Sequence, residues 1–376
     1  MNVELLCKNY QGMSGLARYV QSLRDGLMAL GHTVYCAEPK LPKFMRPLCD
    51  FGRKRNLDLT TFLQTYPIAA NWQLDAPIRH LTTQEMGMLL LTPQHPRTVV
   101  TVHDILPLLL RQQPQLSELN HSAEHFVYRL AMRGLRRATR LIADSDYTKQ
   151  TLITTLRISP SRIAVVPLAI DHTLFRPRPV PTQFWQRFNL PRNKRIILYV
   201  GSDAPRKNLL TLLAAFQQVR QQFGDVLLVK VGATTSAERQ RAFTAEVGRQ
   251  RLTPHVHIFK DVNAVDLVHF YNAADVFAFP SLYEGFGLPP LEAMACGTPT
   301  VCSNAASLPE VVGDAARMHD PYNATACADA ICSILSNPLL AARLRQQGLQ
   351  QASNFTWQRT AQATSRVYKT IAAGNQ

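Results

Sequence analysis

The sequence predicts an α/β protein of two similar domains, each a doubly wound, mostly parallel β-sheet flanked by helices. Three observations support this fold class. The chain has 376 residues, more than one ordinary hydrophobic core holds. Short apolar runs alternate with helix-like segments in both halves, as expected for buried strands joined by helices. A proline-rich segment, residues 171–181, separates the two series and is typical of an interdomain linker.

The first half opens with a βαβ unit. Residues 2–7 are typical of a buried strand, residues 16–30 of an amphipathic helix and residues 33–36 of the next strand. The loop between the first strand and the helix contains glycine but is not G-x-G-x-x-G. Glu38 is the nearest acid to the end of the second strand. A dinucleotide-binding interpretation is weak for these two reasons.

A clear strand at residues 98–102 is followed directly by His103 and Asp104. Ligands of open parallel sheets bind outside the carboxyl ends of the strands, so this position favours a functional histidine over a structural one. Residues 39–95, before it, show no clear pattern and are expected to form loops and short helices. The first half then continues with an expected helix at 122–140, a strand at 140–143, a helix-capping sequence at 144–147 and a strand at 163–167.

The second half repeats the order of strand, loop and helix. Its first strand leads into the loop 201–208, which contains the sequence Pro-Arg-Lys-Asn. The expected strands are 196–200, 226–231, 256–259 and 276–279. The expected helices are 209–222, 264–273, 324–336, 338–350 and 357–372.

The composition is that of a globular protein, with 46% hydrophobic and 18% charged residues. The seven cysteines are scattered and form no C-x-x-C pair, which indicates a reducing compartment and no zinc site. No apolar run reaches the roughly 20 residues of a membrane-spanning helix. The first residues lack the pattern of a signal peptide. We therefore expect a cytoplasmic protein.

The net charge of +15 suggests a negatively charged partner or surface. Both halves are basic, so the charge is not confined to a tail. On the expected helix 122–140, four arginines recur at helical spacing and would share one face: Arg129, Arg133, Arg136 and Arg140. This face is either a plain solvated surface or a stripe that docks at the inner face of a membrane.

Residues 280–313 contain the strongest functional pattern. Glu284 and Glu292 lie on either side of a glycine-rich turn, Gly285-Phe286-Gly287, that leads into a helix. The unpaired N–H groups at a helix start suit an anion. The two carboxylates would repel phosphate, so they suit the hydroxyl groups of the same ligand. A ligand that has phosphate groups beside a polyol is typical of a nucleotide sugar.

Residues 283–299 (YEGFGLPPLEAMACGTP) resemble the E-x7-E motif of the family-4 retaining glycosyltransferases of the GT-B fold. The resemblance covers nearly the whole chain. It includes the strand that ends in His103-Asp104, the stretch 145–149 (SDYTK) and the loop 199–208.

The resemblance implies two Rossmann-like domains facing each other across an interdomain cleft. Residues 1–175 would form the acceptor-side domain, completed by the C-terminal helix at 355–376. Residues 182–354 would form the domain that binds the nucleotide sugar.

The resemblance also implies the roles of the candidate residues. Glu292 would bind the ribose hydroxyls, and Glu284 would lie near the transferred sugar. Arg206 and Lys207 would neutralise the diphosphate, and His103 would contact the donor sugar and face the acceptor. Glu284, His103, Arg206 and Lys207 form the expected catalytic set. Further donor-binding positions are Gly12, Gly15, Gly201, Gly285, Phe286, Gly287 and Leu288.

Breaking the sugar–phosphate bond puts negative charge on the diphosphate, which fixed cations and N–H groups can stabilise without a divalent metal. The chain has no D-x-D motif, and no metal or other cofactor is expected. The resemblance implies retention of the anomeric configuration. It favours GDP-mannose as donor, then a UDP-hexose, with a glycan or lipid-linked acceptor in cell-surface polysaccharide synthesis. Many similar proteins have an acid where this chain has Ala204, and the segment 39–95 matches nothing useful, so the substrates stay open.

Three other functions remain as alternatives. A nicotinamide-dependent oxidoreductase fits the α/β pattern but lacks the glycine fingerprint. A nucleic-acid-binding protein fits the charge, but the chain shows no aromatic–basic interleaving of a known RNA-binding module, so no nucleic-acid partner is expected. A non-catalytic glycan-binding relative is disfavoured because both glutamates and the Arg-Lys pair are present.

Overall fold

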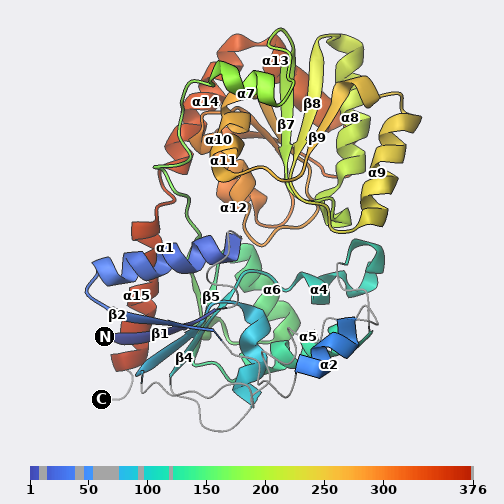
Figure 1. Ribbon diagram of the computed structural model, residues 1–376. Coiled ribbons are helices and arrows are strands. Elements are labelled where there is room, and N and C mark those ends of the chain that lie inside the picture. Colours follow the sequence, from blue (N-terminus) through green and yellow to red (C-terminus); the bar gives the residue numbers. More distant parts are fainter. Residues whose placement is uncertain (8–14, 39–45, 54–75, 92–96, 118–121, 374–376) are drawn as a thin grey trace. The chain divides into compact units, whose positions relative to one another are not determined.

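The structure is a computed structural model that describes residues 1–7, 15–38, 46–53, 76–91, 97–117 and 122–373. Contacts between residues divide the chain into two compact units. The first contains residues 1–168 and 357–376, and the second contains residues 169–356. Each unit is built on a six-stranded sheet, which confirms the predicted α/β class with two parallel sheets (Figure 1).

The sheet of the first unit has the strand order β2-β1-β3-β4-β5-β6, and all its neighbours are parallel. Most of its strands are buried and apolar because helices cover a parallel sheet of this kind on both faces. The strands are β1 (Asn2–Leu6), β2 (Thr33–Ala37), β3 (Ile78–Leu81), β4 (Thr98–Val102), β5 (Arg140–Ala143) and β6 (Ile163–Val165).

The helices of the first unit include one from the end of the chain, α15, which packs on α1. Gly26 of α1 permits this contact, since a Cβ there would lie 2.7 Å from the Cβ of Ala361. The helices are α1 (Gly15–Ala29), α2 (Arg46–Arg53), α4 (Leu106–Leu109), α5 (Ser122–Leu135), α6 (Asp146–Leu156) and α15 (Trp357–Ala373). The 3₁₀ segments are η3 (Gln84–Leu91), η4 (Leu110–Gln112), η5 (Pro114–Leu116) and η6 (Pro160–Arg162).

The expected helix at 122–140 is wrong in its second part. Helix α5 ends at Leu135, and its chain then turns through 3₁₀-type bonds from the Arg136 N–H to the Arg133 carbonyl and from the Arg137 N–H to the Gly134 carbonyl. Arg140 already belongs to β5, where it pairs with Val99 of β4.

The expected stripe of arginines on one helix face is therefore also wrong. Arg129 and Arg133 lie exposed on α5, but Arg136 and Arg140 do not lie on that helix. The side chain of Arg136 donates to the Leu156 carbonyl (3.1 Å), and that of Arg140 to the Ser161 carbonyl (2.6 Å).

Strand β3 was missed because its middle residues are polar. Arg79 and His80 are both buried. Arg79 is paired with Glu4 of β1 at 2.7 Å. His80 lies between the hydroxyls of Thr101 (2.7 Å) and Tyr368 (2.6 Å). Their partners come from distant parts of the chain, so the sequence Ile-Arg-His-Leu has no apolar pattern of its own.

The crossing of η3 and α5 rests on two glycines. A Cβ at Gly134 would clash with the backbone of Gly87, and a Cβ at Gly87 with the carbonyl of Ala131. We expect Gly134→Ala to lower the free energy of unfolding by about 1–3 kcal/mol or more, because the backbones must move apart. Gly248→Ala is the control: it lies in a helix with nothing within 4 Å of the added Cβ. Urea unfolding compares the two, and equal stabilities would contradict the close crossing.

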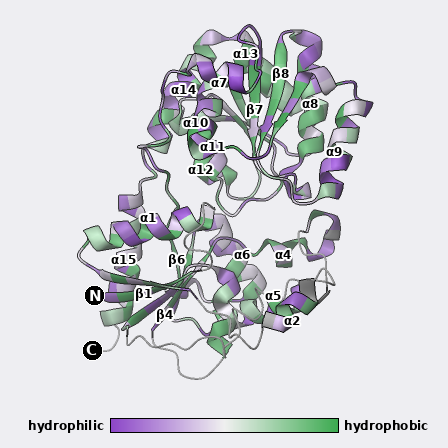
Figure 2. Ribbon diagram, viewed as in Figure 1, coloured by the Kyte–Doolittle hydropathy of each residue, from purple (hydrophilic) through white to green (hydrophobic). Residues whose placement is uncertain are grey.

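The sheet of the second unit has the order β12-β11-β10-β7-β8-β9, again with parallel neighbours. Figure 2 shows hydrophobic residues concentrated on its strands, for example β7 and β8. The strands are β7 (Arg195–Val200), β8 (Val226–Val231), β9 (Val256–Phe259), β10 (Val276–Phe279), β11 (Thr300–Ser303) and β12 (Ala316–His319).

The helices predicted for the second half agree with the structure to within two residues at each end. Helix α9 was missed because most of its residues are polar. The helices are α7 (Thr182–Arg187), α8 (Leu209–Gln222), α9 (Ala237–Arg249), α10 (Ala264–Ala273), α11 (Leu288–Ala295), α12 (Leu308–Val312), α13 (Ala324–Ser336) and α14 (Pro338–Ala352). The 3₁₀ segments are η7 (Pro205–Lys207), η8 (Thr253–His255) and η9 (Gly313–Ala315).

Within the residues that the structure describes, no single helix is long and apolar enough to span a membrane. The pair α13 and α14 reaches the required length and composition only together, across a bend of 102°.

Candidate functional site

In the second unit, a glycine directly follows the carboxyl end of each of the strands β7 and β8. Gly201 and Gly232 follow these strands with φ of +156° and +130°, values that favour glycine. The Gly201 N–H donates to the Val231 carbonyl, and a Cβ on Gly232 would lie 2.5 Å from the Gly201 carbonyl oxygen. Predicted position Gly201 therefore lies where two backbones approach closely at the ligand-binding edge of the sheet.

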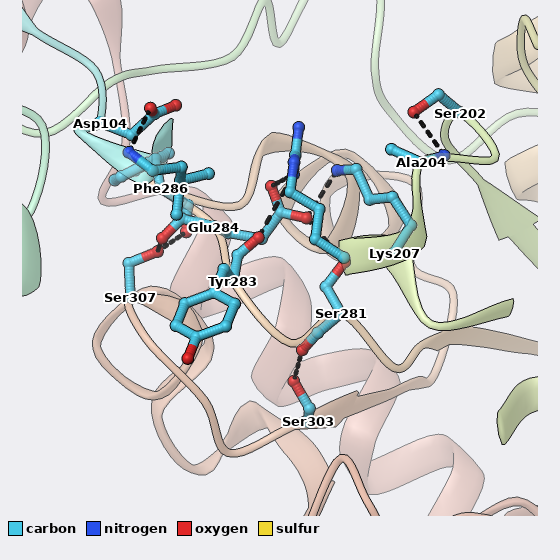
Figure 3. A network of polar contacts seen from close by, with 12 residues as sticks. Asp104, Ser202, Ala204, Lys207, Ser281, Tyr283, Glu284, Phe286, Ser303 and Ser307 are labelled. Atoms are coloured by element: carbon cyan, nitrogen blue, oxygen red, sulfur yellow. Dashed lines mark hydrogen bonds and ion pairs between the residues drawn. The ribbon is translucent and has the colours of Figure 1, made fainter. Parts of the chain in front are cut away.

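Three charged side chains meet beside this edge. Lys207 Nζ lies 2.6 Å from Glu284 Oε1, and Arg206 Nη1 lies 3.4 Å from Glu284 Oε2. The two cations come from η7, and the carboxylate comes from the loop after β10. Figure 3 shows Lys207 beside Glu284. Lys207 Nζ also lies 5.1 Å from the centre of the Phe279 ring, within cation–π range. The structure thus brings predicted residues Arg206, Lys207 and Glu284 together.

The charge state of Glu284 depends on this cluster. Burial raises the pKa of its carboxyl, but Lys207, Arg206 and the Ser281 hydroxyl outweigh burial, so the pKa is lowered. Ser281 donates to Glu284 Oε1 at 2.7 Å. Because the folded pKa is depressed, the stabilisation is present above the ordinary pKa of 4.5 and is lost as the pH falls through the lower, folded value.

The loop that carries Glu284 is fixed by buried serines (Figure 3). Ser303 of β11 donates to the Ser281 carbonyl. The Ser307 hydroxyl lies 3.0 Å from the Glu284 carbonyl and 2.6 Å from the Phe286 carbonyl. The Leu282 N–H donates to the Arg206 carbonyl at 2.8 Å and so joins this loop to η7.

Asn208 joins the same two segments from the other side. It has φ of +59°, a conformation that asparagine tolerates better than most residues. Its amide nitrogen donates to the carbonyls of Pro280 (3.1 Å) and Pro321 (2.7 Å), and its oxygen accepts from the Thr211 hydroxyl (2.7 Å). Asn208 therefore holds the Arg206–Lys207 turn against the loops after β10 and β12.

We expect Asn208→Gly to raise the KM for the ligand of this site about tenfold and to lower the free energy of unfolding by about 1.5–4.5 kcal/mol, the value of three lost hydrogen bonds. Glycine keeps the left-handed backbone, so only the amide is removed. Asn189→Gly is the matched control, since Asn189 is exposed and has φ of +48°. Similar effects from both variants, measured by steady-state kinetics and urea unfolding, would contradict the clamping role.

The turn before α11 offers fewer N–H groups than a typical helix start. Gly287 is the N-cap with φ of +123°, but Pro289 and Pro290 in the first turn have no N–H. The first turn can therefore offer an anion N–H groups only from Leu288 and the residues before it. The predicted backbone donors Gly285, Phe286, Gly287 and Leu288 lie together here.

Glu292 lies on α11 and is 5% exposed. The Tyr271 hydroxyl of α10 donates to Glu292 Oε2 at 2.9 Å, and the Thr298 hydroxyl donates to the Tyr271 carbonyl at 2.7 Å. This arrangement orients the carboxylate as a hydrogen-bond acceptor.

In the first unit, His103 lies at the carboxyl end of β4. Its Nδ1 lies 2.6 Å from Asp144 Oδ2, and its Nε2 lies 3.0 Å from the Thr82 carbonyl oxygen. Tyr19 packs edge-on against the ring, with centroids 5.1 Å apart. Burial lowers the pKa of His103, but the Asp144 charge, both hydrogen bonds and the Asp104 charge outweigh it, so the pKa is raised.

The remaining predicted position in the first unit is the glycine loop. Gly12 lies outside the described residues. Gly15 is the first residue of α1, with nothing within 4 Å of an added Cβ.

Sequence reasoning missed the residues that hold the site in place: Asp144, Asn208, Tyr271, Ser281, Ser303 and Ser307. One of them could have been found. Asp144 directly follows β5, the neighbour of β4, so the rule that selected His103 also applies to it.

Two family profiles match the chain. "Glycosyltransferase Family 4" matches residues 13–174, and "Glycosyl transferases group 1" matches residues 182–351. The second match contains Arg206, Lys207, Glu284 and Glu292.

Two similar curated proteins are mannosyltransferases. The O-antigen chain mannosyltransferase B of Escherichia coli is 32% identical over 243 residues, 63% of this chain and 62% of that protein. The MMP alpha-(1->4)-mannosyltransferase of Mycolicibacterium hassiacum is 34% identical over 241 residues, 63% of this chain and 55% of that protein. The matched segment is thus less than two thirds of either relative's length.

Among solved structures, the sucrose-phosphate synthase of Thermosynechococcus elongatus superposes with a TM-score of 0.77 at 22% identity, over 100% of both chains. At this identity the likeness concerns the fold.

Proposed function

Since this chain belongs to the group 1 glycosyltransferases of family 4, with the GT-B fold, we propose that it transfers a hexose from a nucleoside-diphosphate sugar to a glycan or glycolipid acceptor. The observation that carries the proposal is the cluster of Arg206, Lys207 and Glu284 at the carboxyl edge of the second sheet. Two cations beside one carboxylate give the cluster a net positive charge, which suits a diphosphate. The carboxylate can accept hydrogen bonds from the hydroxyl groups of the sugar.

In this proposal, the second unit binds the donor. Lys207, Arg206 and the backbone around Gly287 would stabilise the diphosphate as it leaves with the electron pair of the sugar–oxygen bond. Glu292, oriented by Tyr271, would accept hydrogen bonds from the ribose hydroxyls. Glu284 would face the transferred sugar, and its negative charge would favour the positive character that develops at the anomeric carbon.

The acceptor hydroxyl forms the new bond to the anomeric carbon and loses its proton to a base or to the departing phosphate. We propose retention of configuration, which the family resemblance supports. His103 of the first unit is assigned to the sugar substrate. Because Lys207 and Arg206 already supply positive charge, the proposed reaction needs no divalent metal.

We assign GDP-mannose as the first candidate donor and a UDP-hexose as the second. Support comes from the two similar mannosyltransferases, one of which is named for an O-antigen chain. A role in cell-surface polysaccharide synthesis follows from the same likeness and belongs to the same proposal.

We further propose that the chain acts in the cytoplasm at the inner face of a membrane. The net charge of +15 supports this, as do Arg129 and Arg133, which lie exposed on α5. Co-sedimentation with vesicles of anionic phospholipid tests it, and absence of binding at low salt would contradict it.

The transfer itself is tested by incubating the purified chain with GDP-mannose, UDP-glucose or ADP-glucose, a chelator, and oligomannose or lipid-linked oligosaccharide acceptors. We expect acceptor-dependent release of nucleoside diphosphate from one donor, with GDP-mannose the first candidate. No release above that of Glu284→Gln from any donor would contradict the proposal.

A further inference from the structure

His103 has a hydrogen-bond acceptor at both ring nitrogens. Nδ1 faces a carboxylate oxygen of Asp144 at 2.6 Å, and Nε2 faces the Thr82 carbonyl oxygen at 3.0 Å. A carbonyl oxygen cannot donate, so Nε2 must carry a proton to make its contact. Nδ1 carries a proton as well if Asp144 is ionised. The ring is then an imidazolium.

The neighbouring His103 favours the ionised carboxylate of Asp144, whereas burial opposes it. Asp144 is 1% exposed, and its other oxygen, Oδ1, has no hydrogen-bond partner among the described residues. A buried carboxylate is stable only beside a compensating charge, and His103 supplies one. Burial raises the pKa of Asp144. The ordinary pKa of aspartate is 3.8, however, well below the ordinary pKa of 6.5 for histidine, so the ring holds the proton more strongly.

The other groups that face His103 do not compete for this role. Asp104, the next residue, adds negative charge that favours the imidazolium. Tyr19 of α1 stays neutral because burial raises its pKa, and it donates to or accepts from Thr101 at 2.8 Å. His80 of β3 stays neutral, since burial lowers its pKa to about 3.

We propose that Asp144 is a positioning residue that holds His103 as a fixed imidazolium, so that the site presents a positive charge there and not a base. Both N–H groups are used inside the protein. The ring side chain is still 23% exposed, so it can act on a substrate through its charge and its polarised C–H edge. The inference about catalysis rests on the proposed function, whereas the inference about protonation does not.

The first test measures protonation directly. Ring ¹H–¹⁵N spectra of the full chain, with His103 identified by its absence from a His103→Gln spectrum, are expected to show two protonated nitrogens at pH 7. The charge should persist above pH 6.5 and disappear as the pH rises through the raised pKa. A neutral ring at pH 7 would overturn the proposal, whether or not the chain transfers sugar.

The second test uses Asp144→Asn, which preserves shape and can donate to Nδ1. The ring should then become neutral while keeping its bond to Thr82, and its pKa should fall by about 1–3 units. We expect kcat at pH 7.5 to fall about tenfold or more, since a fixed charge is lost, with a smaller change in donor KM.

Asp146→Asn is the control, because Asp146 is exposed and lies two residues along the chain. It should leave the His103 pKa and kcat nearly unchanged. Unchanged kcat in Asp144→Asn, in an active enzyme, would overturn the positioning role. Should Asp144→Asn fail to fold, the wild-type spectrum alone still decides the protonation of His103.

Discussion

Replacing Lys207 by alanine is expected to lower kcat for the nucleotide sugar about 100- to 1,000-fold, the usual effect of removing one preorganised charge donor. Lys207 Nζ lies 2.6 Å from Glu284, whose side chain is 11% exposed. Removing the lysine also removes the shorter of the two ion pairs of that buried carboxylate and leaves the Arg206 contact at 3.4 Å, so the free energy of unfolding should fall by about 3 kcal/mol.

Two further variants separate charge from packing. Lys207→Met keeps an apolar stem beside Phe279 and should show nearly the full loss of turnover with less loss of stability. Lys194→Ala removes a lysine just before β7, at the opposite end of that strand, and should have little effect. Steady-state kinetics and urea unfolding give both quantities. Turnover of Lys207→Ala within threefold of the wild type would rule out the assigned role.

Replacing Glu292 by alanine is expected to raise the KM for the donor about 100-fold, with a smaller change in kcat. The carboxylate would accept hydrogen bonds from the ribose, and a bond to a charged group contributes about 1.5–3 kcal/mol. An interaction made equally in the ground and transition states changes KM more than kcat. Glu238→Ala, at an exposed position of α9, is the matched control.

A thermodynamic cycle can measure the interaction energy between Glu292 and the ribose hydroxyls. A nucleoside diphosphate that lacks ribose hydroxyls should bind the wild type weakly, and Glu292→Ala should not distinguish it from the normal nucleotide. Inorganic pyrophosphate, which has no ribose, should inhibit both proteins equally. A variant that still discriminates between the two nucleotides as strongly as the wild type would refute the assignment.

The fold could be predicted where apolar residues dominate a buried strand. Strands β4, β8 and β10 are mostly apolar, with Thr98, Thr101 and Lys230 as their polar residues, and their predicted bounds agree with the structure. Strand β3 could not be predicted because Arg79 and His80 are buried through partners far along the chain. The end of α5 was missed because no proline follows Leu135 and the arginines continue the helical spacing.

The candidate site likewise contains residues that the sequence could predict and residues that it could not. Residues in a compact motif, such as Glu284 and Glu292, could be selected from sequence because their chemistry and spacing are local. Asn208 could not be assigned in this way, since the carbonyls that it binds lie 72 and 113 residues away. The position of Asp144 at the end of β5 could be selected, but its contact with His103, 41 residues away, could not be predicted. Hydrogen bonds between loops at the ends of neighbouring strands depend on sheet order, which the sequence pattern alone does not give.

The most direct test of the central claim is a calorimetric titration of the full chain with GDP and with UDP in the presence of a chelator. We predict saturable binding of at least one of them, with one site per chain, and an affinity lowered about 10- to 100-fold in Lys207→Ala, the value of one hydrogen bond to a charged group. Absence of binding by both nucleotides, or binding unchanged in Lys207→Ala, would contradict it.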